Sequence, residues 1–221
     1  MEFDFSPLVD NWRFLARGLQ LTLLLALATA TCATILGMAV ALARLYGPRW
    51  LRAAMTFYID TMRAIPVLVV LVWTFFAFPI LTGLTLPLFW AALAALTVHI
   101  AAYVAEIIRA GVMSVRPGQS RAALALGMSR AQLMRKIVLP QAVIRMLPAY
   151  GSILSITIKD TAIATVIAVP ELMRQSETIA AQTFRPIEVY TTAMLLFFLI
   201  LFPVTRGVDA VYRRVAHLGR S

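Results

Sequence analysis

Charged residues are scarce in this chain. Asp, Glu, Lys and Arg make up 14% of its 221 residues, whereas hydrophobic residues make up 61%. A typical soluble protein has about 25% charged and about 45–50% apolar residues. The composition therefore excludes an ordinary soluble domain and predicts an integral membrane protein. The length suits one membrane domain over residues 1–221.

Cysteine and lysine are nearly absent. Cys32 is the only cysteine, so the sequence offers neither a disulfide framework nor a cysteine-based metal site. The only two lysines, Lys136 and Lys159, follow Arg135 and Ile158, whereas a P-loop needs a Gly-Lys pair followed by Ser or Thr. We therefore expect no ATP, metal or other cofactor bound by this chain itself.

Long uncharged runs mark the membrane spans. No residue is charged between Arg17 and Arg44, and none between Arg63 and Glu106. A spanning helix needs about 20 apolar residues, so the second run must hold two spans, with a turn at Pro79, Gly83 and Pro87. We predict an all-α membrane protein with five transmembrane helices, at about 18–44, 57–81, 86–109, 148–169 and 189–212.

The basic residues predict how these spans are oriented, because cytoplasmic loops are enriched in Lys and Arg. Of the 20 basic residues, 14 fall on one side of the five-span arrangement: Arg44, Arg49, Arg52, Arg109, Arg116, Arg121, Arg130, Arg135, Lys136, Arg145, Arg206, Arg213, Arg214 and Arg220. Only Arg13, Arg17, Arg174 and Arg185 fall on the other side. We therefore expect the N-terminus outside and the C-terminus inside. Loop positions, rather than nucleic-acid binding, then account for the net charge of +10.

The N-terminal stretch "MEFDFSP" is acidic, whereas a signal peptide begins with basic residues. We expect the first span to be retained.

The segment 110–146 is too charged to span a bilayer and has helical signals. Pro117 suits the first turn of a helix, and Gly127 suits the left-handed position just past its end. Ser129 and Gln132 have the spacing of a capping box, and Pro140 is where the second helix should stop or bend. We expect a helix, a glycine corner and a second helix at the membrane surface. The pattern alone leaves open whether this segment lies on anionic lipid or docks another protein.

A family resemblance bears on that choice. The spacing from Ala122-Ala123 through Gly127 to Ile137-x-Leu139-Pro140 resembles the EAA motif of ABC importer permease subunits. The stretches "EIIRAGVMSVRPGQSRAALALGMS" and "KDTAIATVIAVPEL" resemble polar amino acid permeases, and "MRAIPVLVVLVW" is most similar to glutamate/aspartate-type members. The chain departs from the pattern at Arg121, which stands at the motif's acidic position, and at Val70, where many relatives have glutamine.

The resemblance implies a type I ABC importer permease in the bacterial inner membrane, with a cytoplasmic coupling helix. It implies two ABC ATPase subunits that bind ATP and Mg, a second permease chain that is identical or homologous, and an extracytoplasmic solute-binding protein. The residues expected to contact the ATPase are Gln119, Arg121, Ala122, Ala123, Ala125, Gly127, Met128 and Ser129. The expected cargo is a polar amino acid, with glutamate or aspartate as the first choice and a basic amino acid, glutamine, an opine or ectoine as alternatives.

Ionisable residues at membrane depth are costly and are therefore functional candidates. Lys159 and Asp160 lie deepest, and neighbours in a helix point about 100° apart, so they should face different partners. Arg63 and Glu106 lie nearer the cytoplasmic ends of their spans. We predict a substrate path or gate at Arg63, Glu106, Thr157, Lys159, Asp160 and Thr161. The alternative is that these charges stabilise the helix bundle.

Two other functions fit the sequence less well. An intramembrane serine protease needs a Gly-x-Ser-Gly turn, but no Gly-x-Ser here is followed by glycine, and the one at Gly118 is followed by Arg121 in the loop segment. An ion-coupled transporter would account for Lys159 and Asp160 and leave the coupling segment without a role. The sequence therefore favours a non-catalytic permease subunit.

Overall fold

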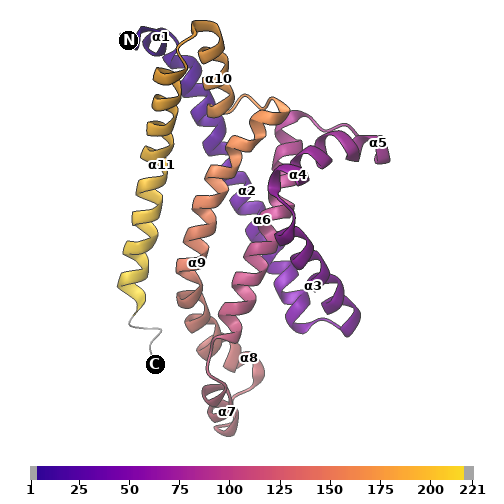
Figure 1. The fold of residues 1–221 in the computed structure, drawn as a ribbon. Coiled ribbons are helices and arrows are strands. Elements are labelled where there is room, and N and C mark those ends of the chain that lie inside the picture. Colours follow the sequence, from indigo (N-terminus) through magenta and orange to yellow (C-terminus); the bar gives the residue numbers. More distant parts are fainter. Residues whose placement is uncertain (1–3, 217–221) are drawn as a thin grey trace.

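The computed structural model describes residues 4–216, and within these the chain is helical with no strand (Figure 1). The elements are α1 (Ser6–Asp10), α2 (Trp12–Tyr46), α3 (Arg49–Ala64), α4 (Val67–Val72), the π-helical η1 (Trp73–Ala77), α5 (Phe78–Thr82), α6 (Leu88–Met113), α7 (Pro117–Ala125), α8 (Arg130–Leu133), the π-helical η2 (Met134–Val138), α9 (Leu139–Asp160), the 3₁₀-helical η3 (Thr161–Ile167), α10 (Leu172–Thr183) and α11 (Pro186–Val215). The prediction of an all-α membrane fold is confirmed.

Four helical runs are long and apolar enough to cross a membrane: Trp12–Tyr46, Leu88–Met113, Arg130–Ile167 and Pro186–Val215. The fifth candidate is broken, because Arg49–Ala64 and Val67–Thr82 meet at 107°. The break lies at Ile65, whose backbone is extended with φ −90° and ψ 133°. Proline disfavours helical backbone in the residue before it, so Pro66 ends α3 at this point.

Helix α6 lies at the centre of the bundle, where it contacts α2, α3, α4 and α9. Its buried face is rich in alanine: Ala91, Ala92, Ala95, Ala101, Ala102 and Ala105 are at most 1% exposed. Small side chains let helices approach closely in a membrane, where packing rather than the hydrophobic effect holds them together. This face explains how α2 and α6 pack along much of their length.

The segment between α6 and α9 matches its sequence signals in part. Gly127 adopts φ 79°, and Ser129 and Gln132 form both hydrogen bonds of a capping box. The expected separate second helix is wrong, because α8 runs on without a break through η2 into α9. Proline has no N–H and its ring crowds the carbonyl four residues earlier, and the π-helical turn just before Pro140 accommodates both.

The two ends of the bundle differ in their elements. Figure 1 shows α1, α5 and α10 at one end, called here the outer end, and α7 and α8 at the other. The α7 end carries the Arg-rich stretches of the sequence and is called the basic end. Positive residues favour the cytoplasmic side, so the basic end is the predicted cytoplasmic face.

Candidate functional site

Helix α7 forms an exposed tip at the basic end (Figure 1). Ala122 and Ala125 are exposed, and so are two larger apolar side chains, Leu124 at 45% and Leu126 at 85%. Ala123 is 3% exposed and faces inward. An exposed leucine at a helix tip is suited to insertion into an apolar pocket of another protein.

The residues predicted to couple to an ATPase lie together on this tip. Arg121, Ala122, Ala125, Gly127 and Ser129 are exposed, Gln119 and Met128 are half-buried, and Ala123 is buried. Leu124 and Leu126 were not among the predicted contact residues. The stretch "SRAALALG" places apolar side chains on several faces of a short helix. A surface helix can bury only one face, so some of these apolar side chains had to be exposed.

A hydrogen-bond network joins α7 to α9. The Gln141 Nε2 atom donates to Gln119 Oε1 at 2.9 Å, and Arg145 donates to the carbonyl oxygen of Ser114. The Arg145 Nη2 atom also donates to Gln141 Oε1 at 3.4 Å. Gln141 and Arg145 belong to α9, so these hydrogen bonds tie the tip to the fourth span.

A second feature, the polar cleft, lies between α9 and α11 and has a volume of about 320 Å³. Its polar lining residues are Ser152, Ser155, Lys159, Thr205 and Asp209. The hydroxyl oxygens of Ser155 and Thr205 lie 3.5 Å apart across it. Gly151 lets α11 approach, because a side chain there would clash with Val208. A hydroxyl- and charge-lined cleft between spans can admit a polar solute that lipid would exclude.

The predicted path residues separate in the structure. Lys159 is exposed and reaches the polar cleft, while its neighbour Asp160 is half-buried. Thr157 and Thr161 are buried, and their hydroxyls donate to the carbonyl oxygens of Ile153 and Ile158 within the same helical run.

The other two predicted path residues lie around α6. Glu106 forms ion pairs of 2.7 Å with Arg44 of α2 and 2.6 Å with Arg109. The Arg63 guanidinium lies 5.6 Å from the ring centroid of Tyr103. The structure therefore does not bring Arg63 and Glu106 to the polar cleft, and their assignment to the path stays a prediction.

At the outer end, Glu171 anchors α10 to α2. Its carboxyl accepts hydrogen bonds from the backbone N–H groups of Met173 and Arg174 at 2.9 and 2.8 Å, and from the Thr22 hydroxyl at 3.3 Å. Burial raises the pKa of Glu171 to about 7, against these hydrogen bonds. Glu171 thus joins the outer helix to the first span through a group that titrates near neutral pH.

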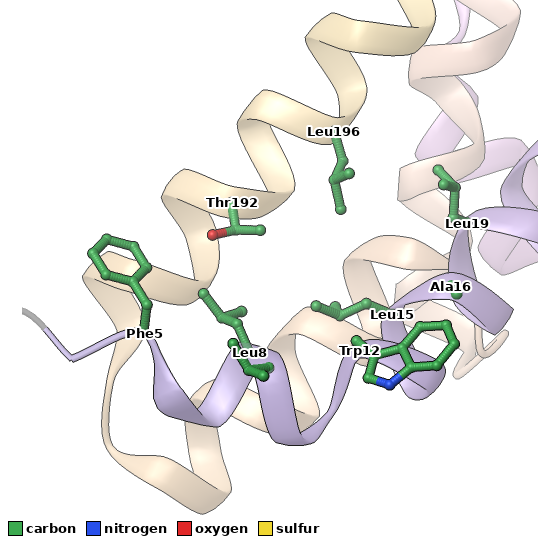
Figure 2. A pocket seen from close by; sticks show the side chains of 9 residues that line it. Phe5, Leu8, Trp12, Leu15, Ala16, Leu19, Thr192 and Leu196 are labelled. Carbon is green, nitrogen blue, oxygen red and sulfur yellow. The ribbon is translucent and has the colours of Figure 1, made fainter.

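A larger hollow at the outer end, about 550 Å³ in volume, is apolar. Figure 2 shows side chains that line it: Phe5 just before α1, Leu8 of α1, Trp12 at the start of α2, and Thr192 and Leu196 of α11. Its polar side-chain groups are the Thr192 hydroxyl, which donates to the carbonyl oxygen of Glu188, and the indole N–H of Trp12. This groove has no charged side chain among its lining residues.

Within the described residues no group of three or more His, Cys, Asp or Glu could hold a metal ion.

Comparisons with known proteins place these features in context. The family model described as "Binding-protein-dependent transport system inner membrane component" matches residues 33–217. The arginine transport system permease protein ArtQ of Bacillus subtilis is 34% identical, over 97% of this chain and 98% of the relative. The octopine transport system permease protein OccM of Rhizobium meliloti is 34% identical (93% and 87%), and the glutamine transport system permease protein GlnP of Escherichia coli is 34% identical (97% and 97%).

Solved structures give the same picture. A chain of an amino acid ABC transporter crystallised with histidines superposes with a TM-score of 0.91 and 33% identity, covering 97% of this chain and 100% of that one. A chain of the inward-facing MetNI methionine ABC transporter superposes with a TM-score of 0.79 and 20% identity, covering 93% and 98%, and this likeness concerns the fold alone.

Proposed function

The chain belongs to the family of binding-protein-dependent transport system inner membrane components and is a permease subunit of an ABC amino acid importer; from this premise we propose that it carries its substrate inward by alternating access, driven by separate ATPase subunits that dock on α7. The single observation that carries the coupling proposal is the exposed α7 tip with Leu126, hydrogen-bonded through Gln119 and Gln141 to α9. Closure of an ATPase dimer would move α7, and the network would pass this movement to the helix that bears Lys159.

The proposed complex holds two ATPase subunits with ATP and Mg, and a second permease chain, identical or homologous. Four straight spans and one broken span leave too little wall to enclose a path, which supports a pair of permease chains about a two-fold axis. An external solute-binding protein would deliver the substrate at the outer end, where the loops around α5 and α10 lie (Figure 1). We propose that this assembly resides in the bacterial inner membrane with α7 in the cytoplasm.

The substrate we propose is a polar amino acid with a basic or amide side chain. The sequence resemblance put glutamate or aspartate first, but the three relatives above are named for arginine, octopine and glutamine. These names favour the alternatives of a basic amino acid, an opine or glutamine. Lys159 in the polar cleft supplies a cation suited to the carboxylate that all of these share.

Docking on α7 is tested by a charge at its tip. We expect Leu126→Asp to reduce copurification of the ATPase subunits at least about tenfold, because an aspartate would enter an apolar pocket unpaired. Ile80→Asp is a matched control, since Ile80 of α5 is 84% exposed against 85% for Leu126 but lies at the opposite end (Figure 1). Equal copurification with both variants would contradict docking at α7.

Energy coupling is tested on the reconstituted complex. ATP hydrolysis that rises when substrate and binding protein are added supports the ATP-driven importer. Uptake that follows an ion gradient and ignores ATP would instead support the ion-coupled transporter.

A further inference from the structure

The polar cleft contains an acidic residue, Asp209, besides the basic residue Lys159. Asp209 of α11 lines the cleft at the opposite end from Lys159, with Ser152, Ser155 and Thr205 between them. Among residues 4–216, neither Asp209 nor Lys159 has an ion-pair partner within 4.0 Å. Unpaired charges on spanning helices are costly unless they face water, a partner or a solute.

The packing of α9 against α11 fixes how far apart the two charges are. Gly151 lies against Val208, and Ser155 lies against Thr205, so the antiparallel helices pair residues whose numbers sum to roughly 360. Lys159 is therefore level with Leu201, and both line the neighbouring apolar cleft. Asp209 is level with Gly151, eight residues below Lys159. At 1.5 Å per residue the two charged residues are separated by about 12 Å along the helices.

A solute that contacts both ends must carry opposite charges at the ends of an extended chain. A basic amino acid does so, with its carboxylate toward Lys159 and its guanidinium or ammonium group toward Asp209. Glutamate would present a second carboxylate to Asp209 and be repelled. Glutamine would present a neutral amide, which the hydroxyls can bind but which gains nothing from the charge of Asp209.

The charged groups around Asp209 leave it available for such a ligand. Arg206 and Arg213 lie three before and four after it on α11, but Arg206 is directed toward the Phe202 ring, 5.2 Å from its centroid. From α9, Arg145 is engaged with Ser114 and Gln141. We infer that the polar cleft is a binding site for a basic amino acid, with Asp209 as the residue that holds the side-chain cation; this inference rests on the proposed function.

The inference is tested by equilibrium binding of labelled L-arginine, L-glutamine and L-glutamate to the purified permease–ATPase complex without binding protein. We expect Asp209→Asn to weaken L-arginine binding about tenfold or more, because the amide removes the negative charge that would hold the guanidinium group. Asp209→Glu should retain L-arginine binding within a few-fold, and L-glutamine binding should change little in either variant. Asp60→Asn, at an exposed acid on α3, is the matched control.

Several results would overturn the inference. The first is L-arginine binding that Asp209→Asn leaves unchanged. The second is a wild-type complex that prefers L-glutamate or binds no L-arginine at millimolar concentration. The third is an equal loss of L-arginine and L-glutamine binding in Asp209→Asn, together with loss of assembly of that variant. The last result would mean that Asp209 pairs with the second permease chain. Each of these results is compatible with ATP-driven amino acid uptake by the wild-type complex, so the proposed function would stand. That function fails separately, if the wild-type complex takes up no amino acid with ATP and binding protein present.

Discussion

At the scale of single residues, Glu171 is a buried carboxyl group outside the spans that joins α10 to α2. Burial is the largest influence on its pKa, and nearby Glu177 raises it further, whereas the hydrogen bonds from Met173, Arg174 and Thr22 lower it. The net result is a pKa of about 7 in place of 4.5. The folded state therefore binds a proton that the unfolded state has released at the same pH.

This shift predicts how stability depends on pH. Because the pKa is raised on folding, the stabilisation is fully present below pH 4.5 and is lost as pH rises through about 7. The loss is on the order of 3 kcal/mol. We expect the melting temperature of the wild type, relative to Glu171→Gln, to fall between pH 5 and pH 8 in detergent. The control Asp10→Asn, at an exposed acid of α1, should follow the wild type. Parallel curves for wild type and Glu171→Gln would show that Glu171 does not titrate in this range.

The sequence predicts residues whose partners are close along the chain better than residues whose partners are distant along it. Ser129 and Gln132 cap a helix three residues apart, so a local pattern suffices to predict them. The burial of Thr157 and Thr161 could not be predicted in this way, because the side of α9 and η3 that is buried depends on the packing of distant helices. Asp209 was passed over for the same reason. A charge near the end of a span usually reaches toward the surface, and only the register against Ser155 and Gly151 brings it into the polar cleft.

At the scale of helices, the close contact of α9 and α11 depends on Gly151. A side chain added at Gly151 would meet Val208, whereas one added at Gly207 of α11 would meet no heavy atom within 4 Å in the part of the chain that the structure describes. The same substitution should therefore cause a clash at Gly151 and none at Gly207.

We expect Gly151→Val to separate α9 from α11 and to lower transport at least several-fold, with overpacking that costs about 1–3 kcal/mol. Gly207→Val should leave transport near the wild-type level. The measurement is uptake per reconstituted complex, with ATPase copurification as a check that α7 still docks. Equal uptake by the two variants would show that the width of the polar cleft at this level does not limit transport.

The helices themselves were predictable in number but not in continuity. Uncharged runs predicted five spans, and Pro66 carried the signal for the break between α3 and α4. Pro140 carried an equally strong stop signal, yet the helix continues through the π-helical turn of η2. Proline restricts the chain locally in both cases, and the packing of the flanking segments decides between a bend of 107° and a continuous helix.

At the scale of the whole molecule, three features lie along one route. The α7 tip lies at the basic end, the network of Gln119, Gln141 and Arg145 joins it to α9, and α9 forms one wall of the polar cleft. Under the proposed coupling, a movement imposed at the tip would reach the cleft along α9. This arrangement gives the proposed alternating access a physical connection within one chain.

The proposed coupling from α7 to the polar cleft requires the basic end to face the cytoplasm, and the arginine distribution predicts this orientation. Cys32 is the only cysteine, so Cys32→Ser provides a background for single cysteines. In intact cells we expect a membrane-impermeant maleimide to label Leu84→Cys, because Leu84 is 62% exposed and follows α5 at the outer end. Arg214→Cys, in the exposed last turn of α11, should be labelled only after permeabilisation. The reverse pattern would place α7 outside the cell, where no ATP-hydrolysing partner could dock, and the proposed coupling would fail with it.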